Sequence, residues 1–493
     1  MAKNDSGFEF EDNRHFYGVV GLLSLFTIIT RFLLIDSDSL WLDEGLSIRL
    51  ASLPFAKIFT EAVPVDHNPP LYLYLLHFWI EIFGNSAAAV RSLSAVMNIL
   101  MVPFIVLTGE KLFNRKIVII TLGLFLLSPF QVYFAQETRA YSLLNLLSII
   151  SIYFFLSVLE NRKKWHIVAY IVSTALLIHT HVYGFFILLA ENLWVLILLL
   201  KRESELKLPA WIVIQGSIGL LFVPYALTFI PLVLSIQQKE YWIAPPGILH
   251  LGGTFVQFCG SLRLGLLFIG LCLYLAIQYF GGKINDEMKG RLHFTLLWMS
   301  TPILVPFILS WIVMPFYLTR YPIAAAIPFY FLAAVGCASL RKKSIFRGVM
   351  ALLIVISGYY LVQYYSNVTR EPWREVVADV RQAAAPGDQI LVGADFCIRE
   401  IFGYYSGNIQ GEVTGLSREG AEDEIIEKSK YLQLKSAGAT LWFIASHFGN
   451  REEVFLQQVS VDYKIEMKRP YYQYDLYNRT VDHIRLYKLV PVE

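Results

Sequence analysis

The chain has 493 residues, of which 56% are hydrophobic and only 16% are charged, and its mean hydropathy is +0.52. Soluble globular domains carry about 25% charged residues, so this composition indicates an integral membrane protein. The formal net charge of +2 lacks the basic surplus that nucleic-acid binding requires, and we expect no nucleic-acid partner. The four cysteines lie far apart without the spacing of a metal site.

Long apolar runs follow one another through most of the chain. The first run, at 16–35, lacks the basic region and the small-residue cleavage site of a signal peptide, so we expect a retained membrane helix. A window of about 20 residues predicts about eleven membrane spans, the last ending near Tyr365. The other ten runs are 86–109, 117–135, 141–159, 167–180, 182–200, 209–234, 262–280, 292–313, 321–340 and 345–365.

Basic residues distinguish the two sides of the predicted membrane domain. Five alternate short loops, "GEKLFNRK", "ENRKKWH", "KRESELK", "GGKINDEMKGR" and "RKKSIFR", together carry sixteen lysines and arginines. Cytoplasmic loops are enriched in these residues, so we place this set and the N-terminus in the cytoplasm. An odd number of spans then places the C-terminal region outside. The expected location is the plasma or inner membrane, with contacts to its lipids.

The chain changes character after the last apolar run. We predict a membrane domain over 1–366 and a soluble extracytoplasmic α/β domain over 367–493. "PWREVVADVRQAAA" has helical periodicity, whereas "DQILVGA" and "ATLWFIAS" are typical of buried strands. "DHIRLYKLV" alternates like an edge strand.

The first outer loop is about fifty residues long, which favours a functional role. It contains "WLDE", with Trp41, Asp43 and Glu44, and later "VDHNPP", with Asp66, His67 and Asn68. Two amphipathic segments, "EGLSIRLASLPFAKIF" and "PPLYLYLLHFWIEIFG", flank the second motif. We predict that both are helices lying in the membrane interface.

Later outer loops add a few lone charges to the same face. "SPFQVYFAQETRAY" carries Glu137, Arg139 and Tyr141, and "MPFYLTRYP" carries Arg320 and Tyr321. Acids and cations are therefore expected to gather on one surface of the bilayer.

Each of these residues also has a structural interpretation. Asp43 and Glu44 can cap the helix that follows them, and Asp66 with His67 can form a polar turn before the proline pair. Glu137 and Arg139 can form an exposed pair, and Arg320 can extend its charge to the interface. His179 and His181 are expected to be interfacial polar residues, and Glu191, inside an apolar run, a packed polar contact.

The order of the motifs provides a more specific interpretation. "WLDE", "DHNPPLY", "FGNSAAAVR", "SPFQVYFAQETRAY" and the late "RYP" together resemble bacterial glycosyltransferase family 39. Its members are membrane enzymes of the GT-C fold, related to protein O-mannosyltransferases and to the aminoarabinose transferase of lipid A. The resemblance extends to about residue 340 and includes the layout of an outer C-terminal domain.

The resemblance implies a membrane glycosyltransferase. Such an enzyme moves a sugar from a polyprenyl-phosphate donor, such as an undecaprenyl phosphate, to an acceptor of the cell envelope on the extracytoplasmic face. Transfer usually inverts the sugar and needs no catalytic metal, so we expect no metal and no cofactor. The acceptor can be a glycan, a lipid or a protein.

The chemistry assigns roles to the matching residues. Asp43 matches the acidic motif of the family and is expected to be the general base, with Glu44 and Asp66 orienting the base or the acceptor. Arg139 and Arg320 match its outer cations and are expected to bind the donor phosphate, because guanidinium groups stabilise phosphate charge. Tyr141 and Tyr321 can donate hydrogen bonds there. The supporting residues are Glu137, Trp41, His67 and Asn68.

The sequence is also compatible with different functions. Some relatives have an "HPP" motif, whereas here the residue before the proline pair is Asn68. The sequence thus departs from the family pattern where His67 and Asn68 would contact the acceptor. A flippase or transporter of lipid-linked glycans would have as many spans, but would favour charges at the bilayer midplane and repeated halves. An oligosaccharyltransferase that moves a preassembled glycan would fit the layout, and so would a membrane sensor with an outer domain.

Overall fold

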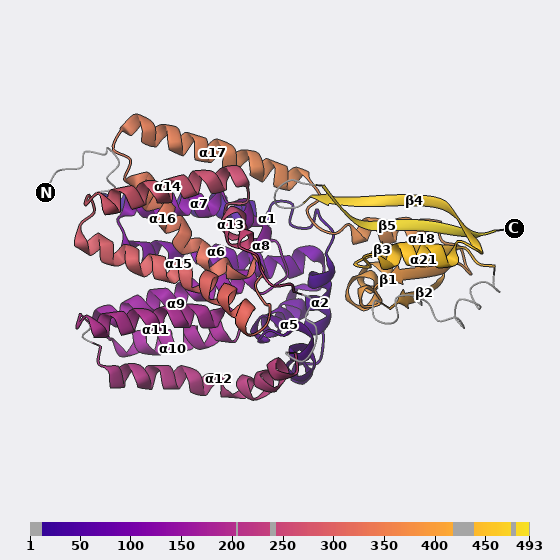
Figure 1. The fold of residues 1–493 in the computed structure, drawn as a ribbon, viewed down its shortest axis with the longest axis horizontal. Coiled ribbons are helices and arrows are strands. Elements are labelled where there is room, and N and C mark those ends of the chain that lie inside the picture. The colour runs from indigo at the N-terminus through magenta and orange to yellow at the C-terminus, as the bar shows by residue number, and fades with distance from the viewer. Residues whose placement is uncertain (1–11, 204–205, 237–242, 418–437, 475–479, 493) are drawn as a thin grey trace. The chain divides into compact units, whose positions relative to one another are not determined.

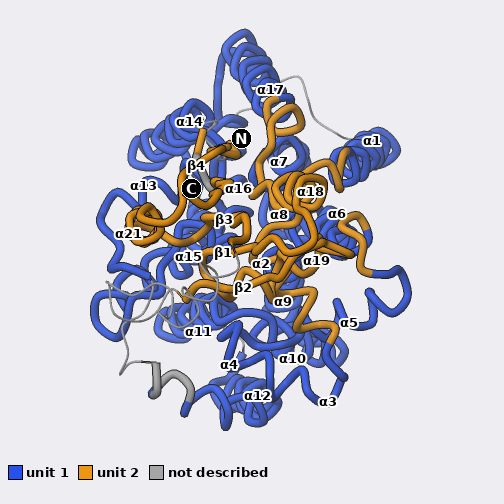
Figure 2. Tube along the Cα trace, turned by 90° about the vertical axis from the view of Figure 1, so that its right-hand side faces the viewer, with its two compact units in different colours: residues 1–33, 53–84, 89–362 blue, residues 34–52, 85–88, 363–493 orange. Residues whose placement is uncertain are grey.

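The computed structural model describes residues 12–203, 206–236, 243–417, 438–474 and 480–492. Contacts between backbone positions divide the chain into two compact units (Figure 2). The first comprises Met1–Leu33, Leu53–Gly84 and Ala89–Val362, and the second comprises Leu34–Ser52, Asn85–Ala88 and Gln363–Glu493. The second unit therefore combines the C-terminal region with part of the first outer loop.

The elements described for the first unit are all helices (Figure 1). Its elements in chain order are α1 (Asn13–Phe32), α3 (Phe55–Lys57), the π-helix η1 (Ile58–Ala62), α4 (Val63–Asp66), α5 (Leu71–Phe83), α6 (Ala87–Leu112), α7 (Arg115–Leu126), α8 (Pro129–Ala135), α9 (Tyr141–Asn161), α10 (Lys164–Ile178), α11 (Gly184–Leu200), α12 (Leu208–Ile236), α13 (Leu249–Cys259), α14 (Leu262–Phe280), α15 (Asp286–Ile312), the 3₁₀-helix η2 (Tyr321–Ala325), α16 (Ala326–Ala338) and α17 (Lys343–Ser366).

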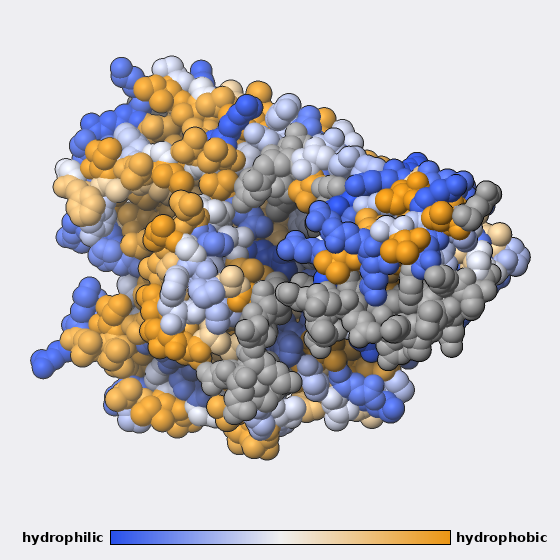
Figure 3. Space-filling view, turned by 45° about the vertical axis from the view of Figure 1, so that its right-hand side comes forward, coloured by the Kyte–Doolittle hydropathy of each residue, from blue (hydrophilic) through white to orange (hydrophobic). Residues whose placement is uncertain are grey.

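Within the described residues, eight helices are long and apolar enough to cross a membrane, or nine if the bent pair α7 and α8 is one span. With the shorter apolar helices α10 and α11, they correspond to the runs from which about eleven spans were predicted. Their outward side chains are apolar, and Leu220 and Val355 are 73% and 68% exposed. Figure 3 shows such side chains over much of the helical surface, as expected where lipid is the solvent. The predicted polytopic helical fold is confirmed.

The third predicted span is broken in the middle. α7 ends at Leu126 and α8 begins at Pro129, at an angle of 61°. Ser128 caps α8 through its hydroxyl, and Pro129 cannot continue α7 because its ring lacks an N–H donor and restricts the preceding residue. The fully buried Arg31 donates to the carbonyl oxygens of Phe125 and Leu126 at 3.2 and 3.0 Å. Its charge thus stabilises the end of α7.

The two amphipathic segments of the first outer loop fold differently. The second segment forms one helix, α5, as predicted. The first is divided near Pro54, because proline ends the hydrogen-bond ladder of α2 (Leu42–Ala51), and α3 with the start of η1 forms the rest of the segment. Only α2 belongs to the second unit.

The rest of the second unit is an α/β domain, as predicted (Figure 1). Its elements are α18 (Trp373–Ala383), β1 (Gln389–Gly393), the π-helix η3 (Ile398–Phe402), α19 (Gly403–Ser406), β2 (Glu412–Leu416), β3 (Leu441–Ser446), α21 (Arg451–Val459), β4 (Tyr463–Tyr474) and β5 (Thr480–Pro491). α18 packs on the sheet through Trp373, Val376, Val377 and Val380, the spacing of one helix face.

The sheet has the order β2-β1-β3-β5-β4. β1 pairs in parallel with β2 and β3, whereas β5 runs antiparallel to both β3 and β4. The prediction that 482–490 is an edge strand is therefore wrong, since β5 lies inside the sheet. The alternating pattern of β5 indicates that one face of the strand is buried and the other is more exposed to solvent. It does not specify whether the strand pairs with one neighbouring strand or with two.

Glu191 has partners deep inside the first unit. Its carboxylate oxygens accept hydrogen bonds from the hydroxyls of Ser151 and Tyr170 at 2.7 and 2.8 Å. The Ser151 hydroxyl also bonds the hydroxyl of Thr174. These contacts link α9, α10 and α11, which supports the interpretation of Glu191 as a packed polar contact.

Candidate functional site

The predicted site residues divide between the two units. Trp41, Asp43 and Glu44 belong to the second unit, together with α2. The remaining predicted site residues belong to the first unit, and they are Asp66, His67, Asn68, Glu137, Arg139, Tyr141, Arg320 and Tyr321.

In the first unit, Asp66 and Arg139 form an ion pair that the sequence did not predict. Arg139 Nη2 lies 2.8 Å from Asp66 Oδ1, and the two side chains are only 14% and 12% exposed. Asp66 ends α4, and Arg139 lies in the turn between α8 and α9. A partly buried charge-assisted pair of this kind holds both side chains in place. The first outer loop is thereby attached to the loop that follows α8.

Glu137 and Arg139 do not form the exposed pair that the structural interpretation allowed. Glu137 is 1% exposed, and Arg139 pairs with Asp66. The backbone of the turn brings the two residues together in another way, because the Arg139 N–H donates to the Glu137 carbonyl oxygen at 2.8 Å.

Arg320 contacts the two tyrosines that the sequence assigned to the same function. Its Nε donates to the Tyr141 hydroxyl oxygen at 3.1 Å, and its guanidinium carbon lies 5.7 Å from the centre of the Tyr321 ring. The Tyr141 and Tyr321 rings stack with their centres 6.3 Å apart. Arg320 therefore packs within the first unit, and the side chain is only partly exposed.

His181, in the turn between α10 and α11, lies near both arginines. Its ring centre is 6.1 Å from that of Tyr141 and 5.4 Å from that of Tyr321. Burial lowers the pKa of His181 to about 3, and the charges of Arg139 and Arg320 act in the same direction. Both guanidinium groups are thus close enough to act on one imidazole, although they lie far apart in sequence.

The hydrogen bonds of His181 define its tautomer. Its Nδ1 accepts a hydrogen bond from the Tyr183 N–H at 3.1 Å, so the neutral ring carries its proton on Nε2. His181 therefore offers a donor without adding a charge. The sequence suggested an interfacial polar residue, and only the order of outer loops could have indicated this position.

The "VDHNPP" motif forms a tight turn. His67 adopts a left-handed conformation with φ +57°, and Asn68 Nδ2 donates to the Asp66 carbonyl oxygen at 3.2 Å. Burial lowers the pKa of His67, while the nearby Asp66 opposes the shift. The Leu71 N–H at the start of α5 donates to the His179 carbonyl oxygen at 3.1 Å. The turn thus attaches α5 to the end of α10.

In the second unit, Asp43 and Glu44 lie in the first turn of α2. The Glu44 carboxylate accepts a hydrogen bond from the Trp41 N–H at 3.3 Å, and its side chain is buried. This contact satisfies a donor at the helix N-terminus, as the structural interpretation expected for Glu44. The Asp43 carbonyl oxygen accepts from the Ser47 hydroxyl, and the Asp43 side chain is half-buried.

The cluster formed by Arg139, Arg320, His181, Tyr141 and Tyr321 can bind an anion. It combines two permanent positive charges with a neutral imidazole donor and phenol hydroxyls, which match the several oxygen atoms of a phosphate. We call these five residues the arginine cluster. Within the described parts of the chain, no three His, Cys, Asp or Glu side chains are grouped to hold a metal ion.

Comparisons with known proteins identify the fold. The sequence model of the dolichyl-phosphate-mannose-protein mannosyltransferase family matches residues 67–244. ArnT from Cupriavidus metallidurans, in the apo state, superposes with a TM-score of 0.61 at 13% identity, over 96% of this chain and 98% of that chain. The same protein bound to undecaprenyl phosphate gives a TM-score of 0.59 at 12% identity, over 97% and 98%.

A third similar structure is the oligosaccharyltransferase of Archaeoglobus fulgidus. It has a TM-score of 0.55 at 11% identity, over 89% of this chain and 70% of that chain. No curated protein sequence matches the chain. The predicted resemblance to GT-C glycosyltransferases is confirmed by the family model and by these folds.

Proposed function

The chain has the GT-C fold of membrane glycosyltransferases related to protein mannosyltransferases, and from this premise we propose that it transfers a sugar from a polyprenyl-phosphate donor to an acceptor of the cell envelope. The observation that carries the proposal is the arginine cluster, in which Arg320 contacts Tyr141 and Tyr321 and the His181 ring lies beside both tyrosines. ArnT, with a similar fold, binds undecaprenyl phosphate. Native mass spectrometry tests the donor class, because undecaprenyl phosphate should bind the intact chain and bind less well to Arg320→Ala.

The arginine cluster is proposed to hold the donor phosphate. Arg139 and Arg320 stabilise its charge, and His181 Nε2–H and the tyrosine hydroxyls complete its hydrogen bonds. Asp66 fixes Arg139 in place before the donor arrives. Its carboxylate also limits the excess positive charge of the empty site, so the proposed role of Asp66 is to position Arg139.

Asp43 is proposed as the general base. In the reaction, the acceptor oxygen forms a bond to the anomeric carbon while the bond from that carbon to the phosphate oxygen breaks. The electron pair leaves with the phosphate, and the acceptor proton moves to Asp43. A phosphate with a last pKa near 6 is a good leaving group, so no general acid is required. The anomeric carbon is inverted, and no metal takes part.

Glu44 is proposed to position Asp43. Its carboxylate accepts a hydrogen bond from the Trp41 N–H at the start of α2, two residues before the base. Loss of this contact would loosen the first turn of the helix. Glu137, His67 and Asn68 are proposed as supporting residues of the turns that present Asp66 and Arg139.

Transfer of a preassembled glycan is the second candidate function. The similarity to the archaeal oligosaccharyltransferase favours it, because a related fold serves that reaction. The two functions share a lipid-linked donor, and they differ in the size of the group that is moved. A lipid-linked glycan flippase has no support from these enzyme folds.

We propose a plasma or inner membrane location, with the N-terminus in the cytoplasm and the second unit outside. In a cysteine-free background, an impermeant thiol reagent added outside should label cysteines introduced at the exposed residues Ser37 and Asn408, but not at Ser344. The basic loops determine this orientation. If the cysteine at position 344 alone were labelled, the opposite topology would hold, and the arginine cluster would lie on the cytoplasmic face.

A further inference from the structure

The second unit contains the candidate base as well as the C-terminal sheet. The segment Leu34–Ser52 clusters with Gln363–Glu493, more than three hundred residues away in sequence. α2, which carries Asp43, packs against η3 of the C-terminal domain. The contacts around α2 show how the two are joined.

A bidentate ion pair fixes the end of α2. Arg49 Nε and Nη2 lie 2.7 and 2.9 Å from Glu400 Oε2 and Oε1. The Glu400 side chain is 8% exposed, and that of Arg49 is 34% exposed. A parallel two-bond contact between guanidinium and carboxylate holds both groups in one orientation. It therefore sets the rotation of α2 about its axis.

The middle of α2 approaches η3 without a side chain between them. A Cβ atom added at Gly45 would lie 2.0 Å from the carbonyl oxygen of Glu400, far inside the contact limit. Only glycine permits this distance. Gly45 is two residues after Asp43 on the same helix, so the close contact also fixes the distance between η3 and the part of α2 that carries the base.

The segment before α2 is held from the other side. The Leu40 N–H donates to the Tyr405 hydroxyl oxygen at 2.6 Å. Asp38 Oδ2 accepts from both the N–H and the hydroxyl of Thr369 at 2.8 Å, and the Arg374 N–H donates to the Ser39 hydroxyl oxygen at 2.9 Å. Contacts with the C-terminal domain thus lie on both sides of Asp43.

We propose that the C-terminal domain acts as the clamp that positions the general base, with Arg49 and Glu400 as positioning residues. This rests on the proposed function of Asp43. A loop of this length would otherwise sample many conformations, and a displacement of about 1 Å at a reacting group can cost about 10²-fold in rate. The donor site belongs to the first unit, so donor affinity should be independent of the clamp.

Glu400→Gln in the full chain tests the clamp. We expect kcat to fall about tenfold with an unchanged KM for the donor, and amide exchange of residues 40–52 to become faster. The exchanged pair Arg49→Glu with Glu400→Arg should recover part of the lost kcat, and the fall in kcat at unchanged KM separates positioning of the base from a general loss of structure. Glu466→Gln, which removes an exposed ion pair with Lys488 between β4 and β5, is the matched control.

Two results separate the clamp from the base. If Glu400→Gln keeps full kcat while Asp43→Asn is inactive in the same assay, or if exchange of residues 40–52 is unchanged, the clamp is wrong. If Asp43→Asn keeps full activity, the assignment of the base is wrong instead, and the exchange rates still report whether Glu400 holds α2.

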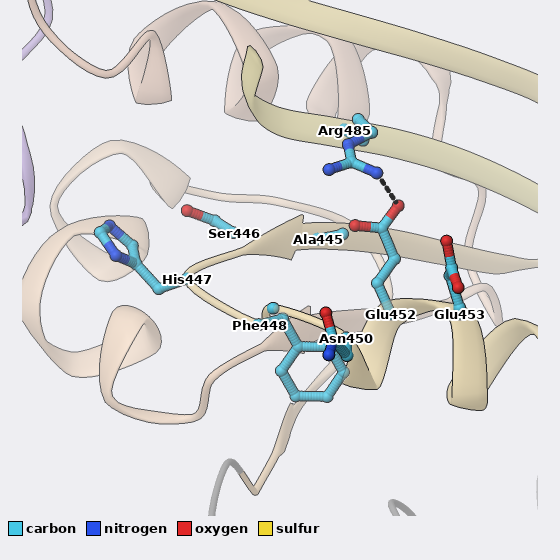
Figure 4. A pocket seen from close by; sticks show the side chains of 9 residues that line it. Ala445, Ser446, His447, Phe448, Asn450, Glu452, Glu453 and Arg485 are labelled. Carbon is cyan, nitrogen blue, oxygen red and sulfur yellow. Dashed lines mark hydrogen bonds and ion pairs between the residues drawn. The ribbon is translucent and has the colours of Figure 1, made fainter. Parts of the chain in front are cut away.

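A separate cavity lies in the C-terminal domain, at the carboxyl end of β3 (Figure 4). It has a volume of about 380 Å³ and lies between the last residues of β3, the first residues of α21 and Arg485 of β5. β3 runs parallel to β1, so the cavity lies at the carboxyl end of a parallel strand of the sheet. Ligands of open α/β sheets bind at the carboxyl ends of such strands.

The polar groups of this cavity are of two kinds. Arg485 donates to Glu452 at 2.8 Å, so the charge of Arg485 is balanced inside the fold, and His447 Nε2 lies 2.8 Å from a carboxylate oxygen of the buried Glu371. The Ser446 hydroxyl is different, because the side chain is 1% exposed and has no hydrogen-bond partner within the described residues. A buried hydroxyl without a partner is destabilising, unless a ligand or water satisfies it.

We infer that this cavity binds a neutral sugar residue of a glycan. Ser446 and Asn450 each donate and accept hydrogen bonds, and the exposed Glu453 at the mouth accepts them. Sugar hydroxyls also do both, and thus match this set without requiring a net charge. An anion would meet the carboxylates of Glu452 and Glu453, so phosphate is disfavoured.

Saturation-transfer NMR of the full chain in lipid nanodiscs, with methyl glycosides of mannose, galactose, glucose and N-acetylglucosamine as probes, tests this site. At least one glycoside should bind, and Ser446→Ala should weaken it several-fold while leaving the thermal midpoint equal or higher, since the variant removes an unpartnered hydroxyl. Ser460→Ala, at the far end of α21, is the matched control. Binding of no glycoside, or equal binding to Ser446→Ala and the wild-type chain, would overturn the inference.

Discussion

Asp43→Asn should lower turnover by about 10²- to 10⁴-fold, the range for loss of a positioned general base. The amide has nearly the shape of the carboxylate, and the carbonyl of residue 43 still accepts the Ser47 hydroxyl, so α2 should remain folded. The variant should bind the lipid donor normally, because it removes only the proton acceptor. Steady-state kinetics with a defined donor and acceptor measures the effect.

Asp36→Asn is the matched control for this prediction. Asp36 lies in the same loop with an exposed side chain, and its contact with Arg374 uses the backbone carbonyl. The control should keep normal turnover. An Asp43→Asn enzyme with more than half of the wild-type activity would show that Asp43 is not the base, and Glu137 would then be the next carboxylate to examine.

Arg139→Ala and Arg320→Ala should each lower kcat/KM for the lipid donor by about 10²-fold. This is the usual effect of removing a hydrogen-bond donor that stabilises a developing oxyanion. The double variant should lose less than the sum of the two free energies, because both residues act on one phosphate. Arg→Lys should also impair donor use, since an ammonium cannot reproduce the planar fork. KM for the acceptor should hardly change.

Arg263→Ala serves as the control for these variants. Arg263 is an exposed arginine at the start of α14 and is outside the arginine cluster. Its loss should leave donor kinetics unchanged. Independent, additive effects at Arg139 and Arg320, or effects on acceptor saturation alone, would contradict a shared phosphate site.

Sequence periodicity was sufficient to predict helices that are determined by the residues within them. Apolar length predicted the membrane helices, and the spacing of Trp373, Val376 and Val380 predicted α18, because burial on one face depends on neighbours within two turns. The break between α7 and α8 was missed, although Ser128 and Pro129 carry the local signal of a helix start. Hydrophobic periodicity thus predicts where a helix lies better than it predicts a break within that helix.

Pairings between distant segments could not be read from the sequence. Asp66 and Arg139 are 73 positions apart, and Arg49 and Glu400 are 351 positions apart, so no periodicity links them. The sequence placed Arg139 and Arg320 on one face through loop order, and it could not show that His181 lies near both. Strand order was also inaccessible, as the internal position of β5 shows.

The most direct test of the proposed function is sugar transfer by the purified chain from a panel of undecaprenyl-phosphate monosaccharides. Mass analysis should find the sugar on an envelope acceptor, or released to water at a slower rate, and NMR should show an inverted anomeric configuration. Arg320→Ala and Asp43→Asn in the same assay should reduce the product, and chelators should not. If no lipid-phosphate sugar is consumed while a preassembled lipid-linked glycan is transferred whole, or if neither donor is consumed, the proposed monosaccharide transfer is contradicted.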